Sequence, residues 1–212
     1  MSSQSPAFVY TEVQLSVPFS HAPWKQLNPT LLRQPGFRNK TWLAGVGNHS
    51  VGGFYEFDSL EHARRFVVDY FPAEARSLGV AQTTRIFDGR PVAEASRQLR
   101  SPHFGARVAK RPGAFVYTEV QVGVPFEQAP WKELNPVLDA QPGLLHKTWL
   151  AGVGTNSLGG FYAFETIPYA LEFAIVYFPT EIAKLSAAYT TRVFDAAVVA
   201  EASSPLRSPY LS

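Results

Sequence analysis

An internal repeat constrains the fold more than any other feature of the sequence. The segment AFVYTEVQLSVPF, which begins at Ala7, returns as AFVYTEVQVGVPF at Ala114, and KTWLAGVG occurs twice at the same offset. When this offset is carried without gaps over the repeat, 58 of 98 positions are identical. Two copies are too few, and the period is too long, for a solenoid. We therefore expect two small domains, at 1–104 and 114–212, joined by a linker at 105–113.

The pattern within each copy predicts strands and helices in the order strand, helix, strand, strand, helix, strand. In the first copy, alternation and turn residues predict strands at 8–17, 37–44, 53–57 and 80–88. Helical spacing predicts helices at 22–34, in two pieces divided at Asn28 and Pro29, and from 59 to about 70. Asp58 and Glu61 resemble a capping box, and Pro72 is expected to end or kink the second helix.

A βαββαβ unit folds as a four-stranded antiparallel sheet with both helices on one face, which leaves the other face to be covered. The second repeat can cover the first. We therefore expect an α+β fold in which two tandem ferredoxin-like βαββαβ repeats pack as an intramolecular dimeric α/β barrel. The covalent link then replaces a homodimer, and a homodimer of these pseudo-dimers stays open.

The composition excludes several classes of protein. Hydrophobic residues make up 46% of the chain and charged residues 17%, which is typical of a compact folded protein. No run of 18 apolar residues and no secretion signal occur, so we expect a cytoplasmic protein that does not enter a membrane. The chain has no Cys, and its net charge of +2 is scattered, which argues against thiolate chemistry and nucleic-acid binding. The five His residues lack metal-ligand spacing, so no metal and no cofactor are expected.

Charged and aromatic residues recur at strand positions in both repeats. On one sheet face we expect a Glu, a Lys and an Arg together, because strand parity allows it. The predicted catalytic residues are Glu12, Lys40, His49, Arg85, Glu119, Lys147 and Arg192. The predicted substrate-binding residues are Tyr10, Trp42, Tyr55, Phe57, Tyr117, Trp149 and Tyr162. Two interpretations stay open: an ion network that orients the two repeats, or a site that polarises a substrate.

The stretch QPGFRNKTWLAGVGNHSVGGFYEF, followed by a helix and TTRIFD, resembles the YdhR-like monooxygenase family of the dimeric α/β-barrel (ferredoxin-like) superfamily. The resemblance covers nearly all of each repeat, and its most specific residues include Lys40, Trp42 and the loop residue His49. Family members are usually single-repeat chains that dimerise. The second repeat has Asn156 in place of His49, so any role for this histidine is confined to the first repeat.

The resemblance implies a small enzyme, a cofactor-independent monooxygenase that acts on a hydrophobic aromatic or polyketide-type small molecule in biosynthesis. Glu12 would abstract a proton, Lys40 or Arg85 would stabilise the resulting phenolate or enolate, and the anion would react with dioxygen. One alternative is a cyclase, isomerase or lyase that uses the same acid–base residues without oxygen. Another is a non-catalytic ligand-binding or structural pseudo-dimer.

Overall fold

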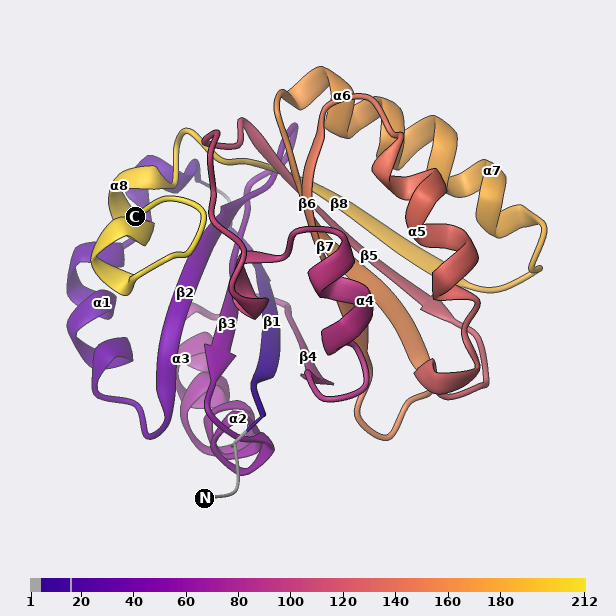
Figure 1. Ribbon diagram of the computed structural model, residues 1–212. Helices are drawn as coiled ribbons and strands as arrows, with labels where there is room; N and C mark the ends of the chain where they lie inside the picture. The colour runs from indigo at the N-terminus through magenta and orange to yellow at the C-terminus, as the bar shows by residue number, and fades with distance from the viewer. Residues whose placement is uncertain (1–4, 16) are drawn as a thin grey trace. The chain divides into compact units, whose positions relative to one another are not determined.

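The computed structural model of the chain describes residues 5–15 and 17–212 (Figure 1). Its contacts divide the chain into two compact units. Unit 1 combines the residues up to Asp88 with the C-terminal segment Val198–Ser212, and unit 2 is Gly89–Ala197. The units therefore differ from the predicted domains 1–104 and 114–212, because the segment that follows the last strand of each repeat belongs to the unit of the other repeat.

Unit 1 contains one antiparallel sheet with the strand order β2-β3-β1-β4. Its elements in chain order are β1 (Ala7–Gln14), a 3-10 turn (Phe19–His21), α1 (Trp24–Leu32), β2 (Phe37–Ala44), β3 (Ser50–Phe57), α2 (Leu60–Arg65), a π-helical turn (Phe66–Tyr70), α3 (Phe71–Leu78), β4 (Gln82–Asp88) and, from the C-terminal segment, α8 (Ala200–Ser203) with a 3-10 turn (Ser204–Leu206).

Unit 2 repeats this architecture with the strand order β6-β7-β5-β8. Its elements in chain order are α4 (Ala93–Gln98), a 3-10 turn (Pro102–Phe104), β5 (Ala114–Gln121), a 3-10 turn (Phe126–Gln128), α5 (Trp131–Asp139), β6 (Leu144–Ala151), β7 (Ser157–Phe164), α6 (Ile167–Glu172), a π-helical turn (Phe173–Tyr177), α7 (Phe178–Ala183) and β8 (Tyr189–Asp195). The predicted α+β class and the ferredoxin-like strand order within each unit are confirmed.

Local details differ from the prediction at several places in the first repeat; β3, for example, begins at Ser50 rather than at 53. The strand predicted at 8–17 ends at Gln14, and part of its predicted end, Ser16, lies outside the described residues. Helix α1 continues through the Asn28–Pro29 pair as one piece, because the Asn28 side chain bonds to other elements rather than capping a new helix. The second helix is capped by Ser59, whose hydroxyl accepts the amide hydrogen of His62, rather than by a box of Asp58 and Glu61.

Pro72 neither ends nor interrupts the long helix of unit 1. The helix passes from α2 into α3 through the π-helical turn Phe66–Tyr70. Proline lacks the amide hydrogen needed for the usual helical bond, and a π-helical turn is one way for a helix to absorb that loss. Pro179 occupies the same place after the π-helical turn of unit 2. The turn brings α3 over the sheet at the position where the cavity described below lies.

The registers of the strands decide which side chains share a face of each sheet. In unit 1, Val9 and Lys40 both pair with Tyr55, so these three share the face that packs against the helices. A β-bulge lies between Phe37 and Asn39 in β2. An extra residue in a strand moves every later side chain to the opposite face of the sheet. This bulge therefore turns Lys40 toward the helices.

The two exchanged segments bind the outer edges of β2 and β6. We call residues 89–113 the first arm, in unit 2, and residues 198–212 the second arm, in unit 1. In unit 1 the amide of Trp42 donates to Ser203 Oγ at 2.9 Å, and the hydroxyls of Thr41 and Ser208 lie 2.7 Å apart. Helix α8 contacts α1, beside which it lies in Figure 1. The arms therefore cover edges that would otherwise present unpaired backbone groups.

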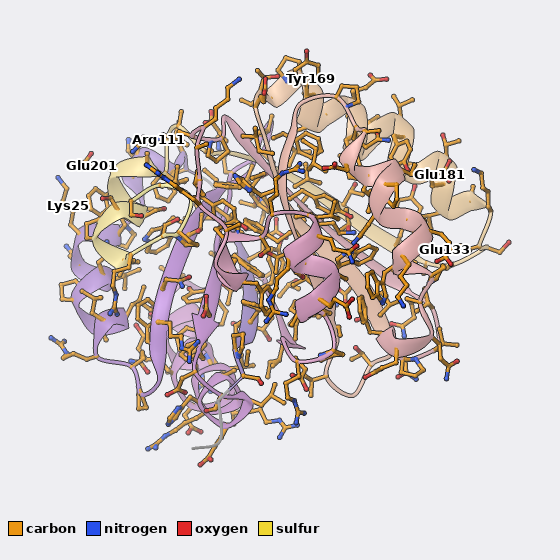
Figure 2. The ribbon with its side chains drawn as sticks, viewed as in Figure 1. Lys25, Arg111, Glu133, Tyr169, Glu181 and Glu201 are labelled. Carbon is orange, nitrogen blue, oxygen red and sulfur yellow. The ribbon has the colours of Figure 1, made fainter. Side chains whose placement is uncertain are left out.

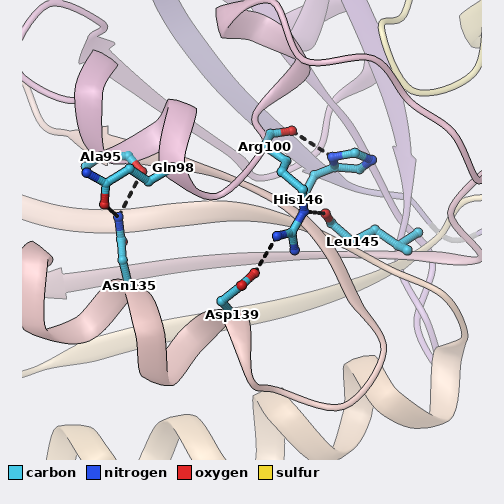
Figure 3. Close-up of polar contacts among 7 residues, drawn as sticks. All are labelled: Ala95, Gln98, Arg100, Asn135, Asp139, Leu145 and His146. Atoms are coloured by element: carbon cyan, nitrogen blue, oxygen red, sulfur yellow. Dashed lines mark hydrogen bonds and ion pairs between the residues drawn. The ribbon is translucent and has the colours of Figure 1, made fainter.

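The first arm is held in unit 2 by polar contacts of Arg100 and His146 (Figure 3). Arg100 forms an ion pair with Asp139 at 2.6 Å and donates through Nε to the carbonyl oxygen of Leu145. The ring Nδ1 of His146 donates to the carbonyl oxygen of Arg100 at 2.7 Å. The residues at the positions of Asp139 and His146 in the first repeat are Leu32 and Asn39. The two units are thus closed by the same kind of segment with different side chains.

No helix within 5–15 and 17–212 is both long enough and apolar enough to cross a membrane.

Candidate functional site

A cavity of about 40 Å³ lies in unit 1 between the helix-covered face of the sheet and the helices α1 and α3. Most of its lining is apolar, including Val13, Leu27 and Phe71. Four polar side chains also line it, and these are Thr11, Lys40, Tyr55 and Glu74. A volume of this size has room for roughly three water molecules. It does not hold a polycyclic ring system, so a large substrate could present only an edge or a short chain to these residues.

The amine of Lys40 is buried among aromatic rings rather than paired with a carboxylate. Its Nζ lies 2.8 Å from the centroid of the Trp42 ring and 4.7 Å from that of Tyr55, and the residue is 1% exposed. No hydrogen bond or ion pair to this nitrogen is found within the described ranges. Burial lowers the pKa of Lys40 well below its ordinary value, and the charge of Glu74 only partly opposes this. Burial therefore shifts Lys40 toward the neutral amine relative to a lysine in water.

Two features of the backbone make room for this lysine. The bulge in β2 turns Lys40 toward the helices, as described above. Gly53, on the neighbouring strand, has no side chain, and a Cβ there would overlap Lys40 Cε and the ring of Tyr55. Gly160 has the same relation to Lys147 and Tyr162 in unit 2. Gly53 in β3 and Gly160 in β7 thus make room for a buried lysine.

Glu74, which the sequence analysis did not identify, brings a carboxylate to the cavity. Its Oε2 is buried and has no hydrogen-bond partner among the described residues. Burial, followed by interactions with Glu74, raises the pKa of both Tyr55 and Tyr70, and the Tyr70 hydroxyl is within hydrogen-bonding reach of Glu74. A signal for Glu74 exists in the sequence, since it lies three residues after the buried Phe71 and therefore on the core-facing side of α3.

The Trp42 ring is fixed by a chain of buried hydrogen bonds that reaches the second arm. Its indole Nε1 donates to Asn28 Oδ1 at 2.9 Å, and Asn28 Nδ2 donates to the carbonyl oxygen of Ala202 at 2.8 Å. Both Asn28 and Trp42 are buried. The wall against which the Lys40 amine rests is therefore positioned in part by residues from the end of the chain.

Unit 2 repeats the lysine and its rings but not the carboxylate. Lys147 Nζ lies 2.8 Å from the centroid of the Trp149 ring and 4.8 Å from that of Tyr162, and burial lowers the pKa of Lys147 well below its ordinary value. Glu181 is the counterpart of Glu74 and is labelled in Figure 2. Its Oε1 forms an ion pair with Lys184 at 2.7 Å on the surface of unit 2. Lys184 stands where the first repeat has Ser77.

The prediction that Glu12, Lys40 and Arg85 share one face is wrong. Tyr10 pairs with Arg85, and Glu12 follows on the same face, whereas Lys40 lies on the helix-covered face. Glu12 accepts a hydrogen bond from the Tyr10 hydroxyl at 2.9 Å, and the exposed Arg85 donates to the carbonyl oxygen of Thr84. The second repeat has the same separation, with Tyr117, Glu119 and Arg192 on one face and Lys147, Trp149 and Tyr162 on the other.

The remaining predicted site residues lie outside the cavity. His49 is an exposed residue of the β2–β3 loop. Phe57 is fully buried and packs against Phe66, with ring centroids 5.1 Å apart, so it belongs to the core. Of the predicted residues in unit 1, the cavity brings together Lys40, Trp42 and Tyr55. Within the described segments, no group of three or more His, Cys, Asp or Glu residues is arranged to hold a metal ion.

A larger groove lies on the surface of unit 1 beside this cavity. It has a volume of about 480 Å³ and runs between the start of α1 and the second arm, where Trp24, Lys25 and Glu201 line it. Ala22 and Pro23 line both the groove and the cavity. The groove falls within the size range of small-molecule sites, and only this short segment separates it from the Lys40 cavity.

The comparisons with known proteins support the fold. No protein-family model matches the chain, and no curated protein matches its sequence. Among solved structures, an "anthrone oxidase-like protein" is similar with a TM-score of 0.56 and 12% identity, over 90% of this chain and 91% of that chain. A "putative monooxygenase" from Lactobacillus acidophilus has a TM-score of 0.51 and 8% identity, over 90% of this chain and 93% of that chain.

A second "putative monooxygenase", from Fusobacterium nucleatum, is similar with a TM-score of 0.50 and 13% identity, over 92% of this chain and 93% of that chain. The similarity therefore extends over both repeats. At these identities it defines the class of fold, a tandem ferredoxin-like α+β protein, and not the chemistry. Membership of the YdhR-like family stays a prediction.

Proposed function

We propose that the chain is a monooxygenase-type enzyme that oxidises a hydrophobic carbon acid with dioxygen, at the unit 1 cavity. The observation that carries this proposal is the buried Lys40 amine, which lines a largely apolar cavity opposite a carboxylate. The names of the structural neighbours, one of them anthrone oxidase-like, favour oxygenation over other chemistries available to such a site.

In the proposed reaction, Lys40 acts as the proton acceptor in place of Glu12. A neutral amine in an apolar site can remove a proton from an activated C–H group, and the resulting carbanion reacts directly with dioxygen. Oxidation of a CH₂ group to a carbonyl places one oxygen atom in the product and releases the other as water. This balance needs no additional reductant. The Trp42 and Tyr55 rings would contact the reacting CH₂ edge that the substrate presents to the amine.

The experiment measures dioxygen uptake with carbon acids of two sizes, anthrone and acetylacetone, against a protein-free control. We expect uptake with at least one of them, lost in Lys40→Met and kept in Lys147→Met, which is the matched control in unit 2. Methionine is close to lysine in shape and suits the apolar surroundings, so folding should survive. Uptake that is unchanged in Lys40→Met would refute the assignment of the base.

An anaerobic arm of the same experiment distinguishes the alternatives. Conversion of either compound without dioxygen, abolished by Lys40→Met, would favour the cyclase, isomerase or lyase function at the same site. Binding of both compounds without conversion under either atmosphere would favour a ligand-binding protein.

A further inference from the structure

The unit 1 cavity combines the groups required for covalent capture of a carbonyl compound. Among the described residues, its amine has no hydrogen bond or ion pair to oxygen, and one buried carboxylate oxygen and one buried hydroxyl make no hydrogen bond of normal geometry. The last two are Glu74 Oε2 and Thr11 Oγ1. We propose that Lys40 condenses with a small aldehyde or ketone in this cavity to form an imine, with Glu74 carrying the proton between the steps. This reaction goes beyond the proposed oxidation and does not depend on dioxygen.

The surroundings of Lys40 suit a nucleophile. An amine attacks a carbonyl carbon only when its lone pair is free, and burial in an apolar pocket is one recognised way to activate a lysine for imine formation. Lys40 Nζ lies against the faces of Trp42 and Tyr55, and a ring face does not donate a hydrogen bond to its lone pair. The lysines of the surface, such as Lys25 and Lys132, are exposed to water and have no such apolar pocket.

The size and lining of the cavity define the class of carbonyl compound. About 40 Å³ is enough for a compound of roughly three or four non-hydrogen atoms. The hydroxyl of Thr11 lines the same cavity and can donate to the carbonyl oxygen of such a compound. Apolar groups such as Val13 and Phe71 would surround its alkyl part. A short-chain aldehyde or ketone fits this description, and an aromatic aldehyde does not.

The protons in the condensation balance within the site. The neutral Lys40 amine adds to the carbonyl carbon and a C–N bond forms. Glu74 accepts the first proton released from nitrogen and passes it to the former carbonyl oxygen, which becomes a hydroxyl. Glu74 then accepts the second nitrogen proton and passes it to that hydroxyl, the C–O bond breaks, and water leaves as the C=N bond forms. The carboxylate ends in its starting state. The Tyr70 hydroxyl, within hydrogen-bonding reach of Glu74, orients the carboxylate during both transfers.

The second unit offers an internal control for this proposal. Lys147 is as deeply buried as Lys40 and contacts the equivalent rings. Its potential carboxylate, Glu181, is bound to Lys184 on the surface instead. A difference in reactivity between Lys40 and Lys147 therefore reports the carboxylate rather than burial.

The experiment treats the full chain with propionaldehyde and cyanoborohydride at neutral pH under nitrogen, and then maps the reduced adducts by peptide mass spectrometry over time. We expect Lys40 to be labelled about tenfold faster than Lys147, Lys25 or Lys132, as expected for an activated lysine. Glu74→Gln should remove this advantage, whereas the matched variant Glu181→Gln should leave it intact. Naphthaldehyde, which is too large for the cavity, should label only surface lysines.

Three results would overturn the proposal. These are labelling of Lys40 no faster than that of Lys147, an unchanged rate in Glu74→Gln, and labelling of Lys40 by naphthaldehyde as fast as by propionaldehyde. The first and last comparisons are made in the unaltered protein, so they do not depend on the folding of any variant. Because the reaction runs without dioxygen, failure here leaves the oxygen-uptake result unaffected, and the converse also holds.

Discussion

Units 1 and 2 share a buried lysine, a tryptophan and a tyrosine in nearly the same geometry, but the carboxylate that lines the site in unit 1 has a counterpart at the surface in unit 2. In unit 1, Glu74 lines the cavity beside Lys40. In unit 2, the equivalent Glu181 pairs with Lys184 at the surface. The two otherwise similar sites thus differ at one aligned position, which is Ser77 in unit 1 and the ion-pairing Lys184 in unit 2. The comparison teaches that the lysine and its rings belong to the architecture of each repeat, whereas the chemistry depends on where one carboxylate points.

The largest expected effect tests whether the two lysines differ in function. Lys40→Met should lower dioxygen uptake by at least about 100-fold, since loss of a general base typically costs 10²–10⁴-fold in rate. Lys147→Met should leave uptake within about twofold, as its unit lacks the inward carboxylate. Rates measured by an oxygen electrode check both. An equal loss in the two variants would mean that the units act alike.

The next effect concerns the asparagines that hold the tryptophans. Asn28→Ala should lower the free energy of unfolding by about 2–4 kcal/mol, because it leaves both the Trp42 indole N–H and the Ala202 carbonyl buried without partners. Asn135→Ala should cost a similar amount, as it removes the bonds to Trp149 and Ala95. Urea unfolding measures both changes. Only Asn28→Ala should also slow dioxygen uptake, and a matching loss in Asn135→Ala would remove the functional contrast.

A smaller effect is a difference between the two units in how stability depends on pH. Burial lowers the pKa of His146 and outweighs the hydrogen bond to the Arg100 carbonyl oxygen, which acts in the opposite direction. The folded chain therefore holds this ring neutral at pH values where the unfolded chain binds a proton, so stability falls as pH drops below about 6.5, the ordinary pKa of histidine. His146→Asn, the residue of the first repeat, should flatten the pH dependence. Hydrogen exchange in β6 at pH 5 and 7 measures this pH dependence. If the original protein and the variant showed the same change in stability between these pH values, His146 would not be its cause.

The smallest expected effect concerns the surface ion pair of unit 2. Glu181→Gln should change the free energy of unfolding by at most about 0.5 kcal/mol, because Lys184 is largely exposed and exposed pairs contribute little. Thermal unfolding measures this change. A loss well above that range would show that the pair holds α7 in place, and the difference between the two carboxylates would then be one of stability as well as orientation.

The repeat, the order of elements and the α+β class could all be predicted from the sequence, because they depend on local periodicity and on a long identical offset. The grouping of Glu12 with Lys40 could not. The face of Lys40 is set by the β-bulge between Phe37 and Asn39, and a single extra residue in a strand leaves no distinct mark in the alternation. Lys40, Trp42 and Tyr55 were nevertheless predicted as site residues, since their types are unusual for a core strand.

Two further features depend on contacts between distant parts of the chain. The spacing of Glu74 from Phe71 places both on one side of α3, but the π-helical turn fixes that this side faces the sheet. The exchange of the two arms depends on which strand edge each segment reaches, and the two edges have nearly the same sequence. The segment VAEAS, present once in each arm, could bind to either repeat as far as the sequence shows.

The exchanged arms have a consequence for how such a duplicated gene can change. Ser203, encoded in the second copy, hydrogen-bonds to Trp42 of the first, and Ser96 of the first copy bonds to Trp149 of the second. A mutation in either arm therefore alters a contact with the other copy, so selection acts on the arm and that strand together. Deleting or replacing one copy would leave a sheet with a mismatched edge, and cutting the gene between the repeats would separate each arm from the strand that it covers. The two copies therefore evolve under a shared structural constraint.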